Sequence, residues 1–290
     1  MKNTSHINTQ VIGLIGHPIK HSYSPFIHNI NIELKKMDYI YLPFDVPTAA
    51  LKNALRGMVA LGIKGFNVTI PHKENIIQHM NNVSEEASII GAVNTIVNDL
   101  GKLNGFNTDV NGILETLLPY KDKISGQEVS VIGAGGAARS VIYSLIRHFK
   151  PKKIHLINRT EQRAESLKGY FSDKMKFDSF KTHELFPPDL VDVFSNSKLI
   201  VNATSIGMFP ASDDVITTLQ KSFVKDQIVF DLVYNPPHTR LLQLAASQGA
   251  ITLDGLTMLV HQAAKSFELW TGEQMQVENI YKSLKLFIAE

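Results

Sequence analysis

The chain has 290 residues, enough for two domains, and its 44% hydrophobic and 19% charged residues are typical of a globular protein with sizeable cores. Twenty-nine Lys and Arg against twenty-seven Asp and Glu give a formal net charge of +2, which argues against binding of nucleic acid through a one-sided basic face. The sequence has no cysteine, which excludes disulfides, thiolate nucleophiles and cysteine-ligated metals.

Short apolar, β-branched runs alternate with helical patterns along most of the chain, which predicts an α/β protein with parallel strands. In the first half we expect strands at 11–16, 39–46, 65–70 and 93–98, with helices at 25–36, 49–61 and 74–80. After a stretch at 118–126 that separates two series, further strands are expected at 128–132, 153–157, 198–203, 228–232 and 251–253. Two helical patterns without a following strand, at 258–271 and 277–289, are predicted to pack back on the first domain.

A glycine-rich turn lies between the strand expected at 128–132 and a helix expected at 140–149. Its residues 133–138 have the G-x-G-x-x-A pattern of a Rossmann dinucleotide-binding unit. Gly133 would permit the tight turn, Gly135 the approach of the backbone to a pyrophosphate, and Ala138 close packing of helix on strand. Turns alone explain many such patterns, but the strand before and the helix after favour a site whose helix amino terminus faces phosphates.

The end of the next strand distinguishes between NADP and NAD. An NAD enzyme usually places Asp or Glu there for the ribose 2′-hydroxyl, whereas this chain has Asn158, Arg159 and Thr160, with Arg163 one helical turn after Arg159. A 2′-phosphate needs cationic donors at that point. Two solvated arginines are the alternative, but cations oppose the dipole at a helix amino terminus, so the sequence predicts NADP.

Polar residues gather in the first half where strand patterns end. They lie in segments 21–25, 67–73, 92–95 and 107–109, and Gln262 lies in a helix near the carboxyl terminus. Strand ends of open α/β sheets point into the binding crevice, which makes these residues candidates for a site. Taken singly, Ser22 or Ser24 would cap a helix, and so would Asp109. Lys73 would be a solvated surface lysine, but a cation at a helix start needs compensation, and Asp109 is the available carboxylate.

The histidines do not predict a metal site. His17 and His21 form H-x-x-x-H, but Pro18 lies between them, so no helix presents both to a metal. His72 and His79 also lack ligand spacing. We expect no bound metal.

Nine blocks of the chain together resemble the shikimate dehydrogenase family. They are residues 21–25, 67–73, 91–95, 105–109, 133–139, 158–160, 202–207, 231–236 and 254–269, in the family's order and spacing. The resemblance implies two α/β domains with a cleft between them. An open α/β substrate domain would comprise 1–109 plus 256–290, and a Rossmann NADP-binding domain 110–255. Arg240, where the family often has proline, is a departure past the expected site.

The resemblance also implies a reaction, the NADPH-dependent reduction of 3-dehydroshikimate to shikimate on the route to chorismate and the aromatic amino acids. Lys73 and Asp109 would be the catalytic acid/base pair, and Ser22 and Ser24 would hold the substrate carboxylate. Further substrate contacts are expected from Asn67, Thr69, Asn94, Asp109, Tyr234 and Gln262. Cofactor contacts are expected from Gly133, Ala134, Gly135, Gly136, Ala137, Asn158, Arg159, Thr160, Arg163, Leu232 and Gly255.

Two alternatives stay open. A quinate/shikimate dehydrogenase with broader specificity and NAD use is disfavoured by the motif at 158–160, and a catalytically inactive NADP-binding regulatory protein is disfavoured by Lys73 and Asp109. The polar amino terminus shows no signal peptide, and no apolar run reaches the roughly 18–20 residues of a membrane span. We therefore expect a cytoplasmic enzyme, monomer or homodimer, with a small-molecule substrate and no nucleic-acid or membrane partner.

Overall fold

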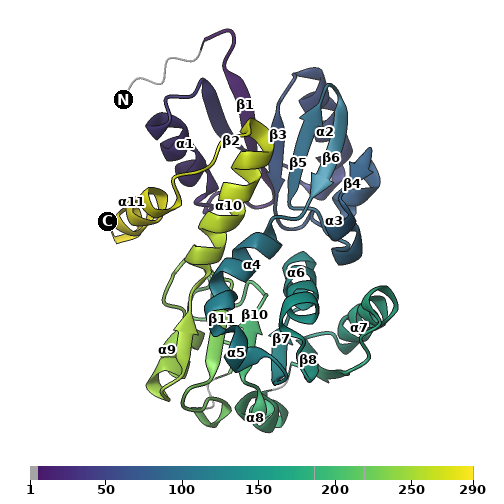
Figure 1. Cartoon of the computed structure of the whole chain (residues 1–290), viewed down its shortest axis with the longest axis vertical. Helices are drawn as coiled ribbons and strands as arrows, with labels where there is room; N and C mark the ends of the chain where they lie inside the picture. The colour runs from purple at the N-terminus through teal and green to yellow at the C-terminus, as the bar shows by residue number, and fades with distance from the viewer. Residues whose placement is uncertain (1–5, 186, 218–219, 290) are drawn as a thin grey trace. The chain divides into compact units, whose positions relative to one another are not determined.

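The computed structural model describes residues 6–185, 187–217 and 220–289 (Figure 1). The chain divides into two compact units, the first made of Met1–Asn111 with Leu259–Glu290 and the second of Gly112–Met258. Each unit contains a six-stranded sheet, which confirms the predicted two-domain α/β class. Within the described ranges, no helix is both long enough and apolar enough to cross a membrane.

The first unit has a mixed sheet with strand order β2-β1-β3-β5-β6-β4. Its strands are β1 Gln10–Gly16, β2 Tyr39–Asp45, β3 Gly65–Val68, β4 Asn82–Val83, β5 Thr95–Asp99 and β6 Lys102–Phe106. β1 runs parallel to β2 and β3, but β5 runs antiparallel to both β3 and β6, so the expectation of parallel strands throughout is wrong here. The reason is a two-residue connection, Leu100 and Gly101, both with positive φ, because so short a turn joins only antiparallel strands.

Helices cover this sheet and extend from both ends of the unit. They are α1 Ser24–Leu34, α2 Leu51–Ala60, α3 Glu85–Ile90 and α11 Val277–Ala289, with 3₁₀ turns η1 Thr48–Ala50 and η2 Asn75–His79. Two further helices, α4 Asp109–Leu117 and α10 Gly255–Thr271, have residues in both units. The helix expected at 74–80 is thus a short 3₁₀ segment, which ends where Met80 turns extended before β4. As predicted, the carboxyl-terminal segment belongs to the first unit, where Phe287 of α11 stacks on Phe26 of α1 at 4.3 Å between ring centroids.

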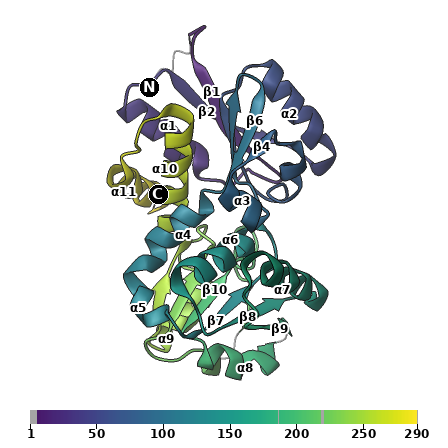
Figure 2. The same ribbon diagram turned by 45° about the vertical axis from the view of Figure 1, so that its right-hand side comes forward.

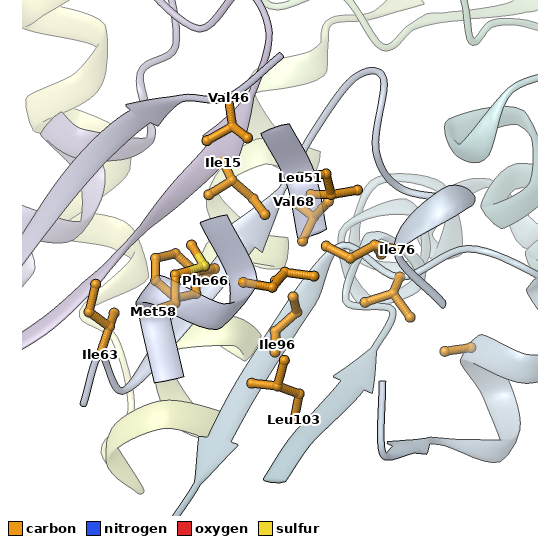
Figure 3. Packing of buried hydrophobic residues seen from close by; sticks show 13 residues of the cluster. Ile15, Val46, Leu51, Met58, Ile63, Phe66, Val68, Ile76, Ile96 and Leu103 are labelled. Atoms are coloured by element: carbon orange, nitrogen blue, oxygen red, sulfur yellow. The ribbon is translucent and has the colours of Figure 1, made fainter. Parts of the chain in front are cut away.

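One core of the first unit lies between its sheet and α2 (Figure 3). Phe66 and Ile96 of the sheet are fully buried, and Leu55 and Met58 of α2 pack in the same cluster. Full burial of a side chain of this size stabilises a fold by about 1.5–3 kcal/mol. The core therefore anchors β3 and β5, the two strands that carry polar residues at one end.

The second unit has a parallel sheet with strand order β12-β11-β10-β7-β8-β9, the doubly wound Rossmann arrangement. Its strands are β7 Glu128–Ile132, β8 Lys153–Asn158, β9 Phe180–Glu184, β10 Leu199–Asn202, β11 Ile228–Asp231 and β12 Ile251–Leu253. Its helices are α5 Lys121–Ile124, α6 Gly136–Ser144, α7 Glu161–Met175, α8 Pro187–Asn196 and α9 Arg240–Ser247, with short helical segments η3 Leu118–Tyr120, η4 Leu145–Phe149 and η5 Gln220–Ser222. Figure 2 shows α6 and α7 alongside β7 and β8. The glycine turn follows β7, where the strand order reverses toward β10, and this is where such folds bind ligands.

Candidate functional site

A buried ion pair joins Lys73 and Asp109 in the first unit. Lys73 lies in the turn between β3 and η2, and Asp109 is the first residue of α4, after β6. The Lys73 Nζ atom lies 2.5 Å from Asp109 Oδ2, and the two side chains are only 16% and 5% exposed. Lys73 is therefore not a solvated surface lysine, and Asp109 is the one carboxylate that pairs with its ammonium group among the described residues.

Asn94 holds the other oxygen of the same carboxylate. Its Nδ2 donates to Asp109 Oδ1 at 2.8 Å, while its Oδ1 accepts from the Thr108 backbone N–H at 2.7 Å. Gln262 of α10 lies at the edge of this group, with Oε1 3.5 Å from Asn94 Nδ2. Both carboxylate oxygens of Asp109 are thus hydrogen-bonded, which a buried ion pair requires.

The antiparallel strand β5 brings these residues together. Asn67 of β3 pairs with Thr95, and Thr95 pairs with Phe106 of β6. The amino end of β5 therefore lies beside the carboxyl ends of β3 and β6. The prediction that each polar segment follows a strand is wrong for Asn94, which precedes β5, because that strand runs in the opposite direction.

Asn67 belongs to a buried network that the sequence patterns did not reveal. Its amide nitrogen donates to Ser266 Oγ of α10 at 2.9 Å. The Ser266 hydroxyl also lies 2.8 Å from Thr95 Oγ1 and 3.0 Å from Thr108 Oγ1. The available signal was that Ser266 follows Gln262 by one helical turn and so lies on the same face of α10.

Ser22, Ser24 and Thr69 lie near strand ends of the same sheet. Tyr23 occupies the cap position of α1 and no side chain caps the helix, so the capping explanation for both serines is wrong. Ser22 Oγ accepts instead from the Ser24 backbone N–H at 3.2 Å, which shapes the turn into α1. Ser24 is buried, and Thr69 is half-buried directly after β3.

A cluster of uncharged aromatic side chains lies beside Asn67. The His28 ring stacks on Tyr41 at 4.3 Å and contacts Phe267 and Trp270. Burial lowers the pKa of His28 to about 3. The nearby Asn67 side chain opposes part of this shift, although it forms no regular hydrogen bond with the ring. The imidazole is therefore neutral at physiological pH and adds no charge beside the polar network.

In the second unit, the turn after β7 contains two glycines, Gly133 and Gly135, which differ in backbone conformation and in surroundings. Gly133 has φ +112°, and a Cβ there would lie 3.0 Å from the Ala203 carbonyl oxygen, so the fold itself requires glycine. Gly135 has an ordinary φ of −101°, and a Cβ there would meet nothing within 4 Å. The open space at Gly135 fits a phosphate-bearing ligand that approaches the backbone at the start of α6. Ala134, Gly136 and Ala137 are half-buried in the same turn.

Arg159 and Arg163 lie at the end of β8 and in the first turn of α7. Both side chains are exposed, and neither forms an ion pair with any residue in the described part of the chain. Asn158 Nδ2 donates to the Thr160 carbonyl at 2.9 Å, which holds the turn that presents them. Two cations at a helix amino terminus without a carboxylate partner suit an anionic ligand.

A buried carboxylate, Asp231, shapes the segment after β11. It accepts hydrogen bonds from Asn202 Nδ2 at 2.9 Å, Val233 N at 3.0 Å and Thr239 Oγ1 at 2.6 Å. Burial raises its pKa to about 6, although these three hydrogen bonds oppose the shift. Asp231 and Thr239 are absent from the predicted site residues, and they hold the ends of the segment that contains Leu232 and the half-buried Tyr234.

Gly255 begins α10 beside that segment. A Cβ on Gly255 would lie 2.4 Å from the Leu232 carbonyl oxygen, so packing alone accounts for the glycine. Gly255, a predicted cofactor residue, belongs to the second unit, as does Tyr234, whereas the other predicted substrate residues belong to the first.

Comparisons with known proteins cover most of the chain. Residues 14–96 match the family model of the shikimate dehydrogenase substrate binding domain, residues 116–246 that of shikimate / quinate 5-dehydrogenase, and residues 255–285 that of the shikimate 5′-dehydrogenase C-terminal domain. The chain is 41% identical over 279 residues to a shikimate dehydrogenase (NADP(+)) of Caldanaerobacter subterraneus, covering 96% of this chain and 97% of that one.

Solved structures agree with these matches. A shikimate dehydrogenase in complex with NADP+ is 38% identical, with a TM-score of 0.89 and 98% of both chains covered. A shikimate 5-dehydrogenase of Listeria monocytogenes in complex with shikimate and NAD is 35% identical, with a TM-score of 0.85 and 98% of this chain and 99% of that one covered. Sequence and fold thus lead to one conclusion: the chain belongs to the shikimate dehydrogenase family.

Proposed function

We propose that the chain catalyses the reversible, NADPH-dependent reduction of 3-dehydroshikimate to shikimate, with Lys73 and Asp109 as the acid/base pair. The observation that carries this proposal is the buried Lys73–Asp109 ion pair, set among hydrogen-bonding side chains in the unit that matches the substrate binding domain. The relatives named for this activity support the substrate. This reaction belongs to the route to chorismate and the aromatic amino acids. We place the enzyme in the cytoplasm, as a monomer or a homodimer.

Reduction of a ketone adds a hydride to carbon and a proton to oxygen. The bound nicotinamide supplies the hydride. The Lys73 ammonium group donates a hydrogen bond to the substrate oxygen and passes a proton to it as negative charge develops there. Asp109 orients that ammonium group and Asn94 orients Asp109, so the donor is in place before the reaction. In the oxidation direction, the Lys73–Asp109 pair takes up the proton of the substrate hydroxyl.

Recognition of the substrate rests on polar side chains of the first unit together with Tyr234. Ser22 and Ser24 hold the carboxylate in this proposal, and the ring oxygens are held by Asn67, Thr69, Asn94, Asp109 and Gln262. Asn67, Asn94 and Gln262 are buried, so an analogue that lacks a hydroxyl loses hydrogen bonds that are made away from water. Sites of this kind reject such analogues by about 10⁴–10⁵-fold.

The residues present fit NADP as the cofactor. Gly133 to Ala137 and the start of α6 would hold the pyrophosphate, and Leu232 and Gly255 would also line the cofactor. Arg159 and Arg163, with Asn158 and Thr160, would hold the 2′-phosphate. The open space at Gly135 supports this assignment, as do the two arginines, which form no ion pair within the described ranges.

The proposed function is tested by following NADPH absorbance with shikimate and quinate, each with NADP+ and NAD+. We expect the highest kcat/KM for shikimate with NADP+. A preference for quinate or NAD+ would favour the broader quinate/shikimate alternative. Binding of NADP+ without turnover of either substrate would favour a regulatory protein instead.

The glycine turn provides a second test. Gly135→Ala adds a methyl group at an ordinary φ and in open space, so we expect thermal stability close to that of the wild type. The same methyl group would stand where the pyrophosphate approaches, and we expect KM for NADP+ to rise by about tenfold or more. Gly133→Ala is the matched control, because its φ of +112° predicts loss of stability in the absence of any cofactor. An unchanged affinity of Gly135→Ala for NADP+ would place the cofactor elsewhere.

A further inference from the structure

Two side chains from distant parts of the sequence hold the Asn67 amide, one on each side. We propose that Tyr41 of β2 and Ser266 of α10 are positioning residues, which fix the orientation in which Asn67 meets a ring oxygen of the substrate. This inference rests on the proposed function, because it concerns how the reaction's substrate is recognised. Neither residue belongs to the predicted site.

The contacts of Asn67 determine which way its amide points. The Asn94 backbone carbonyl lies 3.4 Å from Asn67 Nδ2, and a carbonyl oxygen only accepts hydrogen bonds. The amide nitrogen therefore faces Asn94 and the amide oxygen faces β2. On that side the Tyr41 hydroxyl donates to Asn67 Oδ1 at 2.9 Å.

Ser266 completes the arrangement on the nitrogen side. Its fully buried hydroxyl lies 3.0 Å from the Gln262 carbonyl and donates to it one helical turn back, which leaves its lone pairs to accept from Asn67 Nδ2 at 2.9 Å. The same oxygen lies within hydrogen-bond distance of Thr95 and Thr108. The Ser266 oxygen has two lone pairs, so it accepts from Asn67 and from one of the two threonines at a time.

The threonines extend the influence of Ser266 to the catalytic pair. Thr108 Oγ1 accepts from Asn94 Nδ2 at 3.0 Å and, by donating to Ser266 Oγ, connects the two side chains, while Asn94 Nδ2 also donates to Asp109 Oδ1 at 2.8 Å. One serine hydroxyl thus supports both amides that are proposed to meet the substrate ring.

Fixed partners matter because an asparagine side chain has nearly the same shape after a half-turn of its amide. Such a turn exchanges donor and acceptor with little steric cost, so the hydrogen-bond network alone decides what the substrate meets. Without Ser266 the Asn67 nitrogen loses its shortest acceptor, and without Tyr41 the oxygen loses its donor. Either loss leaves the amide less firmly fixed: without Ser266 the nitrogen keeps only the longer contacts to the Asn94 carbonyl at 3.4 Å and to Thr95 Oγ1 at 3.3 Å.

The test is a double-mutant cycle measured by steady-state kinetics. We expect Ser266→Ala to lower kcat/KM for shikimate by about 3- to 10-fold, the effect of losing the shortest hydrogen bond that orients Asn67, with KM for NADP+ unchanged. In an Asn67→Ala background the same change should cost less than about twofold, because its target is absent. The matched control is Ser144→Ala in α6, which also removes a fully buried hydroxyl that donates one turn back, at 2.8 Å, and it should not affect kcat/KM for shikimate.

Tyr41→Phe is the second variant, and it decides the question if Ser266→Ala unfolds. It removes the hydroxyl and keeps the ring that stacks on His28 at 4.3 Å. We expect the same selective loss in kcat/KM for shikimate and the same dependence on Asn67. Losses of equal size with and without Asn67 would show a general structural role and overturn the proposal. Wild-type activity in both variants would also overturn it, whereas an inactive wild type would instead refute the proposed function.

Discussion

Lys73→Ala is expected to lower kcat for shikimate oxidation by about 10²–10⁴-fold while KM for shikimate changes little. The physical reason is that Lys73 is the group proposed to exchange a proton with the reacting oxygen, a contribution made in the transition state. Its Nζ atom is held 2.5 Å from Asp109, so in the wild type the donor needs no rearrangement. Steady-state kinetics with shikimate and NADP+ measure both parameters.

Loss of Lys73 also leaves the Asp109 carboxylate buried without its cation, so folding must be measured alongside activity. A thermal unfolding curve for Lys73→Ala separates lost protein from lost chemistry. Lys35→Ala is the matched control, since Lys35 pairs with Glu273 at 2.8 Å outside the site and its loss should leave kcat unchanged. A large rise in KM with kcat intact would show that Lys73 only binds substrate.

Arg159→Ala is expected to weaken NADP+ binding by about 10- to 100-fold, as for loss of a charge-assisted hydrogen bond, and to leave NAD+ binding nearly unchanged. The reason is that the two cofactors differ only in the 2′-phosphate, which is the group proposed to meet Arg159. The exposed guanidinium has no ion pair among the residues that the structure describes, so its removal breaks none there. Titration with each cofactor measures both affinities.

Arg240→Ala is the control for Arg159→Ala. Arg240 is also an exposed arginine beside a helix start in the second unit, where it lies 3.5 Å from Gln243. Its removal should change both affinities by less than about twofold, as is usual for a surface substitution. Equal losses for NADP+ and NAD+ in Arg159→Ala would contradict a 2′-phosphate role.

Local features of the fold could be read directly from the sequence. The strand, glycine turn and helix around Gly133 follow from short-range requirements, because only glycine adopts the φ of +112° found there without strain. The alternation of strands and helices likewise predicted the parallel sheet of the second unit, since parallel strands need long crossover connections. The β5–β6 hairpin was missed because its turn residues, Leu100 and Gly101, do not form one of the common Asn-Gly or Asp-Gly turn signals.

The candidate site, like the fold, could be predicted only in part from the sequence. Residue types and a family resemblance were enough to predict Lys73 with Asp109 and the arginines after β8, because these are matters of charge and of position along the chain. Only the tertiary structure decided that Ser22 and Ser24 do not cap α1, that Asn94 enters from the start of an antiparallel strand, and that Tyr41 and Ser266 hold Asn67 from either side. Hydrogen bonds between residues so far apart in sequence depend on how strands and helices pack, and no local pattern records them.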